Sequence, residues 1–423
     1  MKNRKKRTNV DQQLSRTNEK LSIRNGIATT VILNISNNYF ALFAISVLGV
    51  TNYQVGLMSS LPQFIGMFAM ILGSFILNQL NEKKKFTAYS FLFTRIFLLL
   101  MFFVMYLPAE YRGWVFVLLV GLMNLPGSFA NLSWQSFIGD LIPDQRRNSF
   151  FSERNRVLTI VGMIATFLIG IMLQQFQADS HLPFQFLFLV GFVVGIIEVY
   201  YLLKHKEPKR EKIKEGRKVI FGWHVFKHKP FVYFLICGLF FNFAWQMAWS
   251  LFSIYQIKYA LATGLWISLF AVANQIAQIA SFKWWGKMAD KHSNAKMLIL
   301  VALGMGSAPF LTILSTNLYY LVAVNAFSGL FVSGTVLLLF NQLLEVTTED
   351  NRSICISNYN ILLAIIAFIA PQFGVFLLET WGMTTAMTLS SILRSGSAIF
   401  FIGLFLYLKS KKSLENQQKG FVV

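Results

Sequence analysis

The chain has 423 residues, of which 55% are hydrophobic and only 13% charged, and its mean hydropathy is +0.54. A soluble globular domain carries about 25% charged residues, so this composition excludes an ordinary soluble fold and indicates a chain built for lipid. The net charge of +20 would suit nucleic acid, but its distribution along the chain, described below, argues against that partner.

Long apolar runs recur along the whole chain, and each is long enough to cross about 30 Å of hydrocarbon. They predict an all-α membrane protein with twelve transmembrane helices, and the ninth and tenth are separated only by Ser315-Thr-Asn317. The expected spans are 25–49, 54–80, 86–107, 113–138, 154–176, 183–203, 229–257, 263–285, 297–315, 317–343, 357–379 and 384–408.

The basic residues are distributed very unevenly relative to these spans. Of the 38 Lys and Arg residues, 34 fall on one side of the membrane, while the opposite side holds only Arg112 and Lys258. Basic loops stay in the cytoplasm, so both termini are expected there, in a multi-pass protein of the cytoplasmic membrane. The basic loops would also bind anionic lipid headgroups.

The few residues suited to metal chemistry are scattered. Cys237 and Cys355 lie far apart in apolar surroundings, and all five His residues fall in loops. Neither a metal nor another cofactor is expected. Paired carboxylates or nucleophile–base spacings at one depth are also lacking, and no Walker A phosphate loop occurs, so an enzyme or a direct ATP-driven pump is not expected.

The chain repeats itself in its two halves. The segment from Asp140 through Arg147 to Asn155 recurs 205 residues later, from Glu345 through Arg352. The same offset aligns Asn37 with Asn242 in the first and seventh spans, and an offset of 212 aligns Gln63 with Gln275 in the second and eighth. Two similar membrane halves in one chain are typical of secondary transporters, whose binding site lies between the halves.

The only long hydrophilic stretch between spans divides the chain at its centre, with six spans on each side. This predicts a basic, disordered or surface-bound N-terminal arm, two six-helix bundles, a cytoplasmic linker and a tail. Their ranges are 1–24 for the arm, 25–203 for the N-terminal bundle, 204–228 for the linker, 229–408 for the C-terminal bundle and 409–423 for the tail.

The chain resembles the major facilitator superfamily over about residues 20–410. Gly286, Asp290, Lys291 and Ser293 are similar to the family's loop motif between the eighth and ninth helices. The resemblance implies two pseudo-symmetric six-helix bundles, with the first, fourth, seventh and tenth helices lining a central cavity. The chain lacks the fourth-helix Arg and the fifth-helix Gly-Pro-Gly-Gly motif of the family's drug/proton antiporters.

Uncharged polar residues inside the transmembrane spans, together with Trp245, are the candidate substrate-binding groups, since polar groups in hydrocarbon need a cavity or a partner. In the fourth span Asn124, Asn131 and Gln135 form one stripe. The candidates are Asn37, Asn38, Gln63, Asn124, Asn242, Trp245, Gln246, Gln275 and Asn325. Amides without carboxylates suggest a neutral or weakly polar solute. The alternative for each amide is a hydrogen bond between helices.

Three ionisable residues lie inside spans, namely Arg95, Glu198 and Arg394. The family resemblance implies that the third and sixth helices pack side by side, so Arg95 and Glu198 could meet as an ion pair. By helical rise alone the two residues differ in depth by roughly 6 Å, which their side chains could cover. Glu198 could instead reach the membrane surface or take part in proton coupling. No partner for Arg394 is evident from the sequence, which leaves it as a candidate site for an anion.

Charged residues at the cytoplasmic helix ends are candidates for weak gating bridges, each worth about 0–1 kcal/mol. The expected pairs are Asp140 with Arg147, Glu345 with Arg352 and, by the family resemblance, Asp290 with Arg154. The alternative is that these charges only fix the orientation of the chain in the membrane.

These features favour a transporter that moves a small solute by alternating access of two bundles around a midplane site. An exporter of hydrophobic drugs or a lipid flippase of the same fold is the first alternative. A transporter-like sensor or scaffold without transport is the second. The expected partners are the solute, the lipid bilayer and a coupling proton or ion, and the expected assembly is a monomer.

Overall fold

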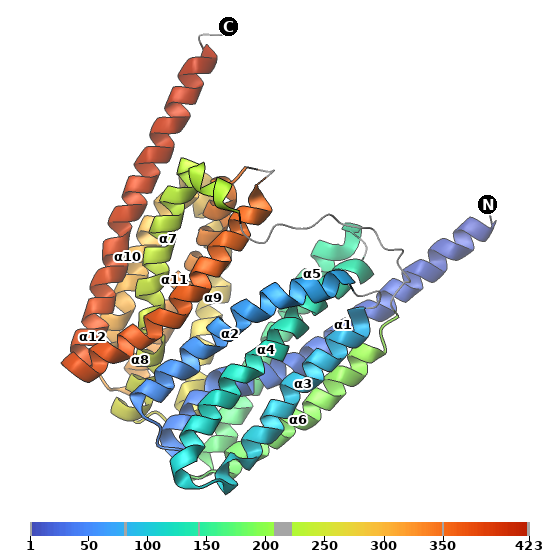
Figure 1. Ribbon diagram of the computed structural model, residues 1–423, viewed down its shortest axis with the longest axis vertical. Coiled ribbons are helices and arrows are strands. Elements are labelled where there is room, and N and C mark those ends of the chain that lie inside the picture. Colours follow the sequence, from blue (N-terminus) through green and yellow to red (C-terminus); the bar gives the residue numbers. More distant parts are fainter. Residues whose placement is uncertain (1, 80–82, 143, 207–221, 349–350, 421–423) are drawn as a thin grey trace. The chain divides into compact units, whose positions relative to one another are not determined.

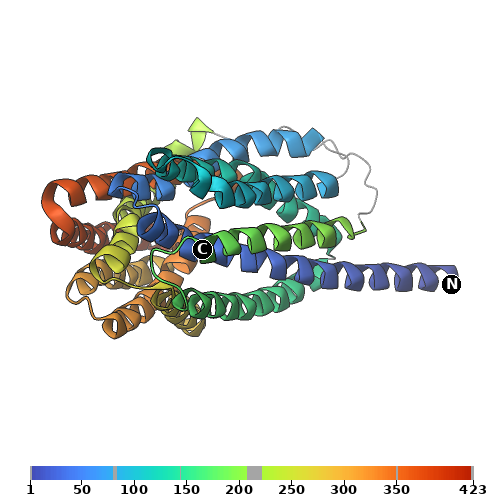
Figure 2. The same ribbon diagram turned by 90° about the horizontal axis from the view of Figure 1, so that it is seen from below.

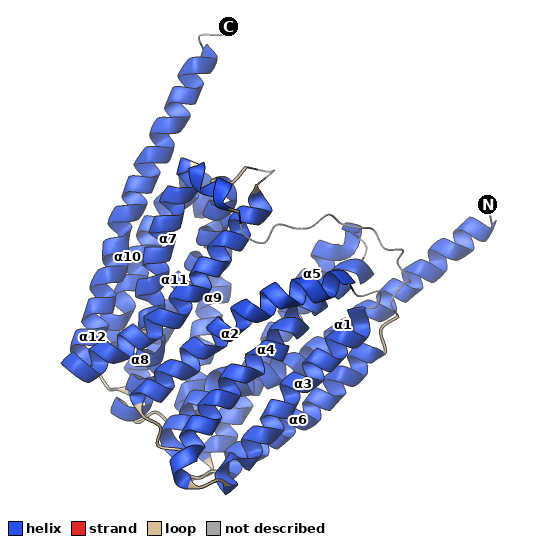
Figure 3. Cartoon of the chain, in the orientation of Figure 1, coloured by secondary structure: helices blue, strands red, loops and turns tan. Residues whose placement is uncertain are grey.

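The computed structural model describes residues 2–79, 83–142, 144–206, 222–348 and 351–420. Throughout these ranges the chain consists of helices joined by short loops (Figure 3). It divides into two compact units, unit 1 with Met1–Gly216 and Thr263–Ser268, and unit 2 with Arg217–Ala262 and Leu269–Val423. The exact boundaries of arm, linker and tail stay a prediction.

Unit 1 contains six long helices, drawn blue to green in Figures 1 and 2. Within it α2 and α3 both pack on α4, and α6 packs on both α3 and α1, while α1 also packs on α5. Its elements are α1 (Lys2–Leu42), η1 (Phe43–Val47), α2 (Asn52–Gln79), α3 (Lys83–Phe103), η2 (Val104–Tyr106), α4 (Ala109–Leu141), α5 (Asp144–Gln174) and α6 (Leu182–Leu203).

Unit 2 holds the other elements, and its last helix folds back on itself in Figure 1. Within it α12 packs on α10 and α7, and α10 packs on α11. Its elements are η3 (Trp223–Lys227), α7 (Lys229–Met247), α8 (Trp249–Ile254), η4 (Tyr255–Tyr259), α9 (Gly264–His292, whose start belongs to unit 1), α10 (Asn294–Ile313), α11 (Leu318–Glu345) and α12 (Arg352–Gly420).

The predicted all-α fold with twelve transmembrane helices is confirmed. Within the described residues ten helices are long and apolar enough to cross a membrane. The last of them, Ile354–Lys411, comprises two spans, because Gly382 adopts a φ of 82° that L-residues avoid and turns the chain. The 28-residue α2 supplies the remaining span. The ninth and tenth spans end and begin as expected, with Asn317 capping α11 by accepting from the Tyr320 amide.

Aromatic side chains fill the interior of unit 1. The Phe43 ring meets Phe116 and Phe188 edge to face, with centroids 5.1 Å apart in both pairs. This geometry is favoured by the aromatic quadrupole and joins η1, α4 and α6. Large apolar side chains such as Phe93 and Leu168 are instead exposed, as expected of helices that face lipid.

The N-terminal arm, residues 1–24, was expected to be disordered or to lie on the membrane surface. The structure contradicts disorder, because α1 is helical from Lys2 onward and continues without a break into the first span. A position on the membrane surface stays a prediction. Because a helix is costly to nucleate but easy to extend, a polar segment joined to a stable span can continue its helix. Near the start of the span, Asn18 and Asn25 are buried against the end of α6.

The seventh span is interrupted rather than continuous. The helix α7 ends at Met247, and the Ala248 amide bonds to the Gln246 carbonyl, so the Ala244 carbonyl lacks its usual donor four residues on. In α10, Pro309 has no N–H to offer Met305. Two helices of unit 2 therefore carry carbonyls that need donors from elsewhere.

Arg394 of α12 supplies these donors. Its Nε donates to the Ala244 carbonyl at 3.1 Å, its Nη2 to Trp245 at 2.8 Å and its Nη1 to Met305 at 3.1 Å. The side chain is only 1% exposed. The expectation that Arg394 is unpartnered and available to an anion is therefore wrong, because neighbouring helices present backbone carbonyls that the sequence pattern does not reveal.

A histidine is buried where α6 meets the start of the linker. The His205 ring is 1% exposed, with Nδ1 3.0 Å from the carbonyl oxygens of Tyr201 and Leu202, and the Phe137 ring packs edge-on against it. Burial lowers the pKa of His205 below its ordinary value of 6.5, and the positive charge of Lys84 acts in the same direction. The folded chain therefore binds a proton at this ring less readily than the unfolded chain does.

Replacing Arg394 by Met should remove its donors from the three carbonyls, of which Ala244 keeps only the Ser390 hydroxyl, and lower stability by about 1–3 kcal/mol. The measurement is the melting temperature of the purified protein in detergent. The matched control is Lys409→Met, which removes an exposed charge from the end of the same helix. Equal melting temperatures for Arg394→Met and wild type would show that the carbonyls do not depend on this side chain.

Stability should fall as the pH drops below 6.5, because the unfolded chain then binds a proton at His205 that the folded chain does not. Above that pH both states are neutral there and the effect is absent. Melting temperatures from pH 8 to pH 5 should show a steeper decline for wild type than for His205→Gln. Substitution of His181, in a loop, is the control, and an unchanged slope in His205→Gln would contradict the assignment.

Candidate functional site

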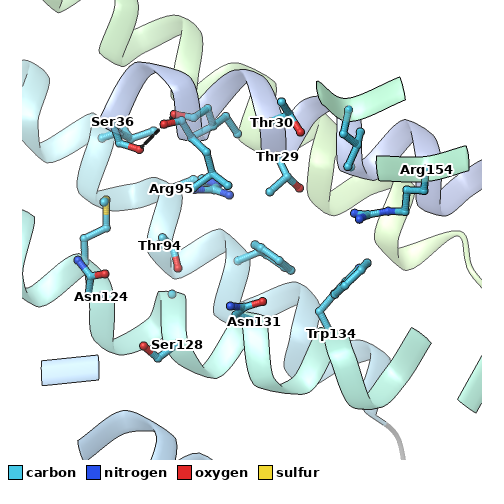
Figure 4. A pocket seen from close by; sticks show the side chains of 18 residues that line it. Thr29, Thr30, Ser36, Thr94, Arg95, Asn124, Ser128, Asn131, Trp134 and Arg154 are labelled. Carbon is cyan, nitrogen blue, oxygen red and sulfur yellow. Dashed lines mark hydrogen bonds between the residues drawn. The ribbon is translucent and has the colours of Figure 1, made fainter. Parts of the chain in front are cut away.

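A cavity of about 390 Å³ lies within unit 1, between α1, α3, α4 and α5 (Figure 4). It has both polar and apolar walls, and the polar side chains come from all four helices. The lining residues are Gly26, Thr29, Thr30, Ile32, Leu33, Ser36, Phe91, Thr94, Arg95, Leu98, Met123, Asn124, Gly127, Ser128, Asn131, Trp134, Arg154 and Leu158.

Helix α4 contributes a polar stripe to this cavity. Asn124, Ser128 and Asn131 follow one another at spacings of four and three, which places them on one helix face. The Asn124 amide donates to the Val120 carbonyl of its own helix at 2.9 Å, which leaves its carbonyl oxygen for another partner. The opposite wall carries the hydroxyls of Thr29, Thr30 and Ser36.

Arg95 and Glu198 form a buried ion pair at the edge of the cavity, as the sequence analysis expected. Nε of Arg95 lies 2.8 Å from Oε2 of Glu198, and Nη2 lies 3.1 Å from Oε1. The Thr29 hydroxyl also donates to Oε1, and the Asn25 amide donates to the Glu198 backbone carbonyl. The two-pronged geometry suits Arg, whose planar guanidinium matches a carboxylate.

The predicted substrate-binding residues of unit 1 are spread over several places. Asn124 lines the cavity. Asn38 donates to the Asn34 side chain and to the Thr166 hydroxyl, both at 3.2 Å, so it joins α1 to α5. Asn37 and Gln63 are exposed on α1 and α2. The structure thus favours the helix-joining alternative for Asn38, and substrate contact by Asn37 or Gln63 stays a prediction.

In unit 2 the amide of Asn242 is engaged between helices. Its Nδ2 donates to the Gly238 carbonyl at 2.7 Å and to the Tyr359 hydroxyl at 3.2 Å, and the residue is 3% exposed. Gln246, equally buried, has an Oε1 without a hydrogen-bond partner among the described residues. Trp245 packs edge to face on Trp249. Asn242 therefore joins α7 to α12.

The remaining two predicted amides lie on α9 and α11. Asn325 donates from its side chain to the Leu321 carbonyl, and its backbone carbonyl accepts from the Asn274 amide at 2.9 Å. Gln275 is partly buried on α9. The Asn274 side chain thus joins α9 to α11, whereas the Asn325 side chain bonds within its own helix. Substrate contact by Asn325 or Gln275 stays a prediction.

The sequence matches the model of the Major Facilitator Superfamily over residues 26–284 and 261–421, which together span nearly the whole chain. The chain belongs to the Major Facilitator Superfamily. Membership makes it a membrane transporter rather than an enzyme, in agreement with the sequence analysis. No protein of curated function matches the sequence.

Solved structures of other transporters share the fold. The nucleoside transporter NupG superposes with a TM-score of 0.70 at 13% identity, covering 93% of this chain and 99% of that one. A D-xylose-proton symporter gives 0.68 at 12% identity, covering 91% and 96%. A POT family transporter in complex with 5-aminolevulinic acid gives 0.64 at 12% identity, covering 89% and 95%. At such identities the likeness concerns the fold alone.

The gating pairs expected of this superfamily member have mixed outcomes. The side chains of Asp140 and Arg147 lie outside the described residues. Glu345 does not pair with Arg352 as expected; it accepts instead from the Asn294 amide at 3.1 Å, because the start of α10 lies within reach of the end of α11. Asp290 and Arg154 belong to different units, so their pairing stays a prediction.

Several cavity residues of the transporter were missed from sequence. Thr29, Thr30, Thr94, Ser128 and Trp134 were not among the candidates, although all line the cavity. Ser128 could have been found, since it completes the helical stripe of Asn124 and Asn131. The Thr residues carry no such signal, because Thr in a membrane helix commonly bonds to its own backbone, as Thr94 does with the Ser90 carbonyl.

The ion pair at the cavity edge allows a double-mutant test. Glu198→Gln should lower stability by about 3–5 kcal/mol, since it leaves the Arg95 charge buried without its partner. The double variant Arg95→Met with Glu198→Gln should recover much of that loss, with Arg95→Met alone as the second single variant of the cycle. Melting in detergent is the measurement. A loss in the double variant equal to the sum of the two single losses would show that the pair is not coupled.

Proposed function

We propose that this transporter moves a small polar solute across the cytoplasmic membrane by alternating access of its two units, with the unit 1 cavity as part of the solute's binding site. The observation that carries the proposal is the cavity of about 390 Å³, which falls in the usual range for small-molecule sites. Membrane transporters of repeated architecture commonly bind their solutes near the bilayer midplane.

The chemistry of the cavity wall supports a solute with several hydrogen-bonding groups. Hydroxyls of Thr30, Ser36 and Ser128 and the amides of Asn124 and Asn131 face one another across it (Figure 4). Two transporters of the same fold have nucleoside and D-xylose in their names. Both are hydroxyl-bearing solutes of a size that such a cavity accepts, so hydroxyl-bearing solutes are the first class to test.

The proposed orientation places both termini and the basic loops in the cytoplasm. Its support is the distribution of charge, with 34 of the 38 Lys and Arg residues on that side. Glu198 is the acid proposed to respond to a coupling proton. Its carboxylate is held by Arg95 and Thr29, so protonation would release both partners.

Uptake into proteoliposomes tests the proposal, with radiolabelled nucleosides, pentoses and sugar acids and with or without a proton gradient. For the transported solute, Asn124→Leu should reduce uptake about tenfold, because one hydrogen bond of about 1–1.5 kcal/mol is lost. Gln175→Leu, an exposed amide outside the cavity, is the control. Full uptake by Asn124→Leu and Asn131→Leu together would place the site elsewhere, and transport restricted to hydrophobic drugs or lipids would refute the proposed solute class.

A further inference from the structure

Arg154 of α5 is a buried cation at one end of the unit 1 cavity. It is 9% exposed and lines the cavity together with Trp134, whose ring lies 4.3 Å from the guanidinium carbon. Gly26 on α1 leaves room for it, because a Cβ at that position would come within 2.7 Å of Nη2. The packing of three helices thus makes a place for this side chain.

No carboxylate neutralises Arg154 among the described residues. Its single hydrogen bond there runs from Nε to the Ser22 carbonyl and is long, at 3.5 Å. The ion pairs of the described part of unit 1 join other residues, Arg95 with Glu198 and Arg146 with Glu19. Within the described part of the chain the two terminal nitrogens of Arg154, which carry most of its donors, have no acceptor.

The neutralised Arg95 and the unneutralised Arg154 give the cavity wall a net positive charge. Burying an ion without its partner costs several kcal/mol, so such groups are retained mainly where they bind something. The Trp134 ring offers a cation–π contact worth roughly 0.5–2 kcal/mol, which offsets only part of that cost. An anionic group of the ligand would offset the rest.

The cavity is elongated and its two ends differ. Figure 4 shows Arg154 and Trp134 at one end and Ser36 and Asn124 at the other. Along α1 the lining runs from Gly26 to Ser36, which corresponds to about 15 Å of helix. One end thus offers a cation and an aromatic face, and the other offers uncharged hydrogen-bonding groups.

We propose that Arg154 is the anion-binding end of the transport site, and that the solute carries a carboxylate or phosphate at one end and hydroxyls or similar uncharged polar groups at the other. This inference rests on the proposed function and gives its solute a charge. Two parallel N–H donors from a guanidinium match a carboxylate or a phosphate, and charge-assisted bonds of this kind are about twice as strong as neutral ones.

Sugar acids and sugar phosphates are suitable probes, because they differ from a neutral sugar chiefly in one anionic end. Binding of gluconate, glucose 6-phosphate and glucose to the purified full-length protein is measured by thermal shift and by titration calorimetry, at ionic strength matched with sodium chloride. Wild type should bind the two anionic probes about tenfold or more tightly than glucose. Arg154→Gln should abolish that preference.

Matched variants separate this role from general charge and from gating. Arg156→Gln removes an exposed charge two residues further along α5 and should keep the preference. Arg154→Lys keeps the charge without the planar fork and should retain part of it. Asp290→Asn should also keep the preference. If Arg154 acts only by pairing with Asp290, Arg154→Gln will leave anion binding unchanged, which contradicts the inference.

Each outcome decides the inference. Anion preference in wild type and Arg156→Gln that is lost in Arg154→Gln supports it. Equal binding of glucose and gluconate, absence of any anion binding, or a preference that survives Arg154→Gln in a folded protein overturns it. Uptake of a neutral solute without Arg154-dependent anion binding would sink the inference and keep the proposed function. Arg154-dependent anion binding without uptake of any solute would do the reverse.

Discussion

A charge or an unpaired backbone group inside a lipid-embedded helix bundle has to find its partner within the protein, because neither lipid nor water is there to supply one. Unit 2 meets this constraint by pairing unbonded backbone carbonyls with a buried arginine. The break after Met247 and the proline at position 309 leave carbonyls without donors, and Arg394 brings a charge without a carboxylate. Arg394 donates three hydrogen bonds to these carbonyls, which pairs both the charge and the carbonyls and joins α7, α10 and α12.

Unit 1 forms a corresponding three-helix junction by a different chemistry, with its arginine on another helix of the triplet. There Arg95 lies on α3, and its partner Glu198 on α6 also accepts from Thr29 on α1. Counted as transmembrane spans, α1, α3 and α6 are the first, third and sixth, and α7, α10 and the second half of α12 are the seventh, ninth and twelfth. The two triplets therefore correspond in the repeated halves of the chain. The duplicated fold has therefore kept a polar junction of three helices while its residues changed. Arg154 does not follow this rule, which is why it indicates a ligand.

On either side of the central segment, at Lys206 and at Gly222, a buried Asn side chain makes the same pair of hydrogen bonds to the backbone. Asn18 of α1 donates to the Lys206 carbonyl and accepts from the Lys206 amide, at 3.2 and 3.1 Å. Asn358 of α12 makes the same two bonds with Gly222, at 2.9 and 3.3 Å. Both Asn side chains are buried, and each pairs with the N–H and C=O of one residue beside the central segment.

Length and hydropathy are local properties, so the sequence by itself determined the spans, the repeated halves and the superfamily. The family resemblance also implied the pairing of Arg95 with Glu198, since it places the third and sixth helices side by side and helical rise puts the two residues at similar depths. The rotation of each helix and the backbone irregularities of its neighbours are not local. Only the tertiary structure decided that Asn242 and Asn38 join helices, that Arg394 meets carbonyls freed by a break and a proline, and that threonines, Trp134 and Arg154 share a cavity. A hydrogen bond depends on both partners, and a sequence pattern describes only one of them.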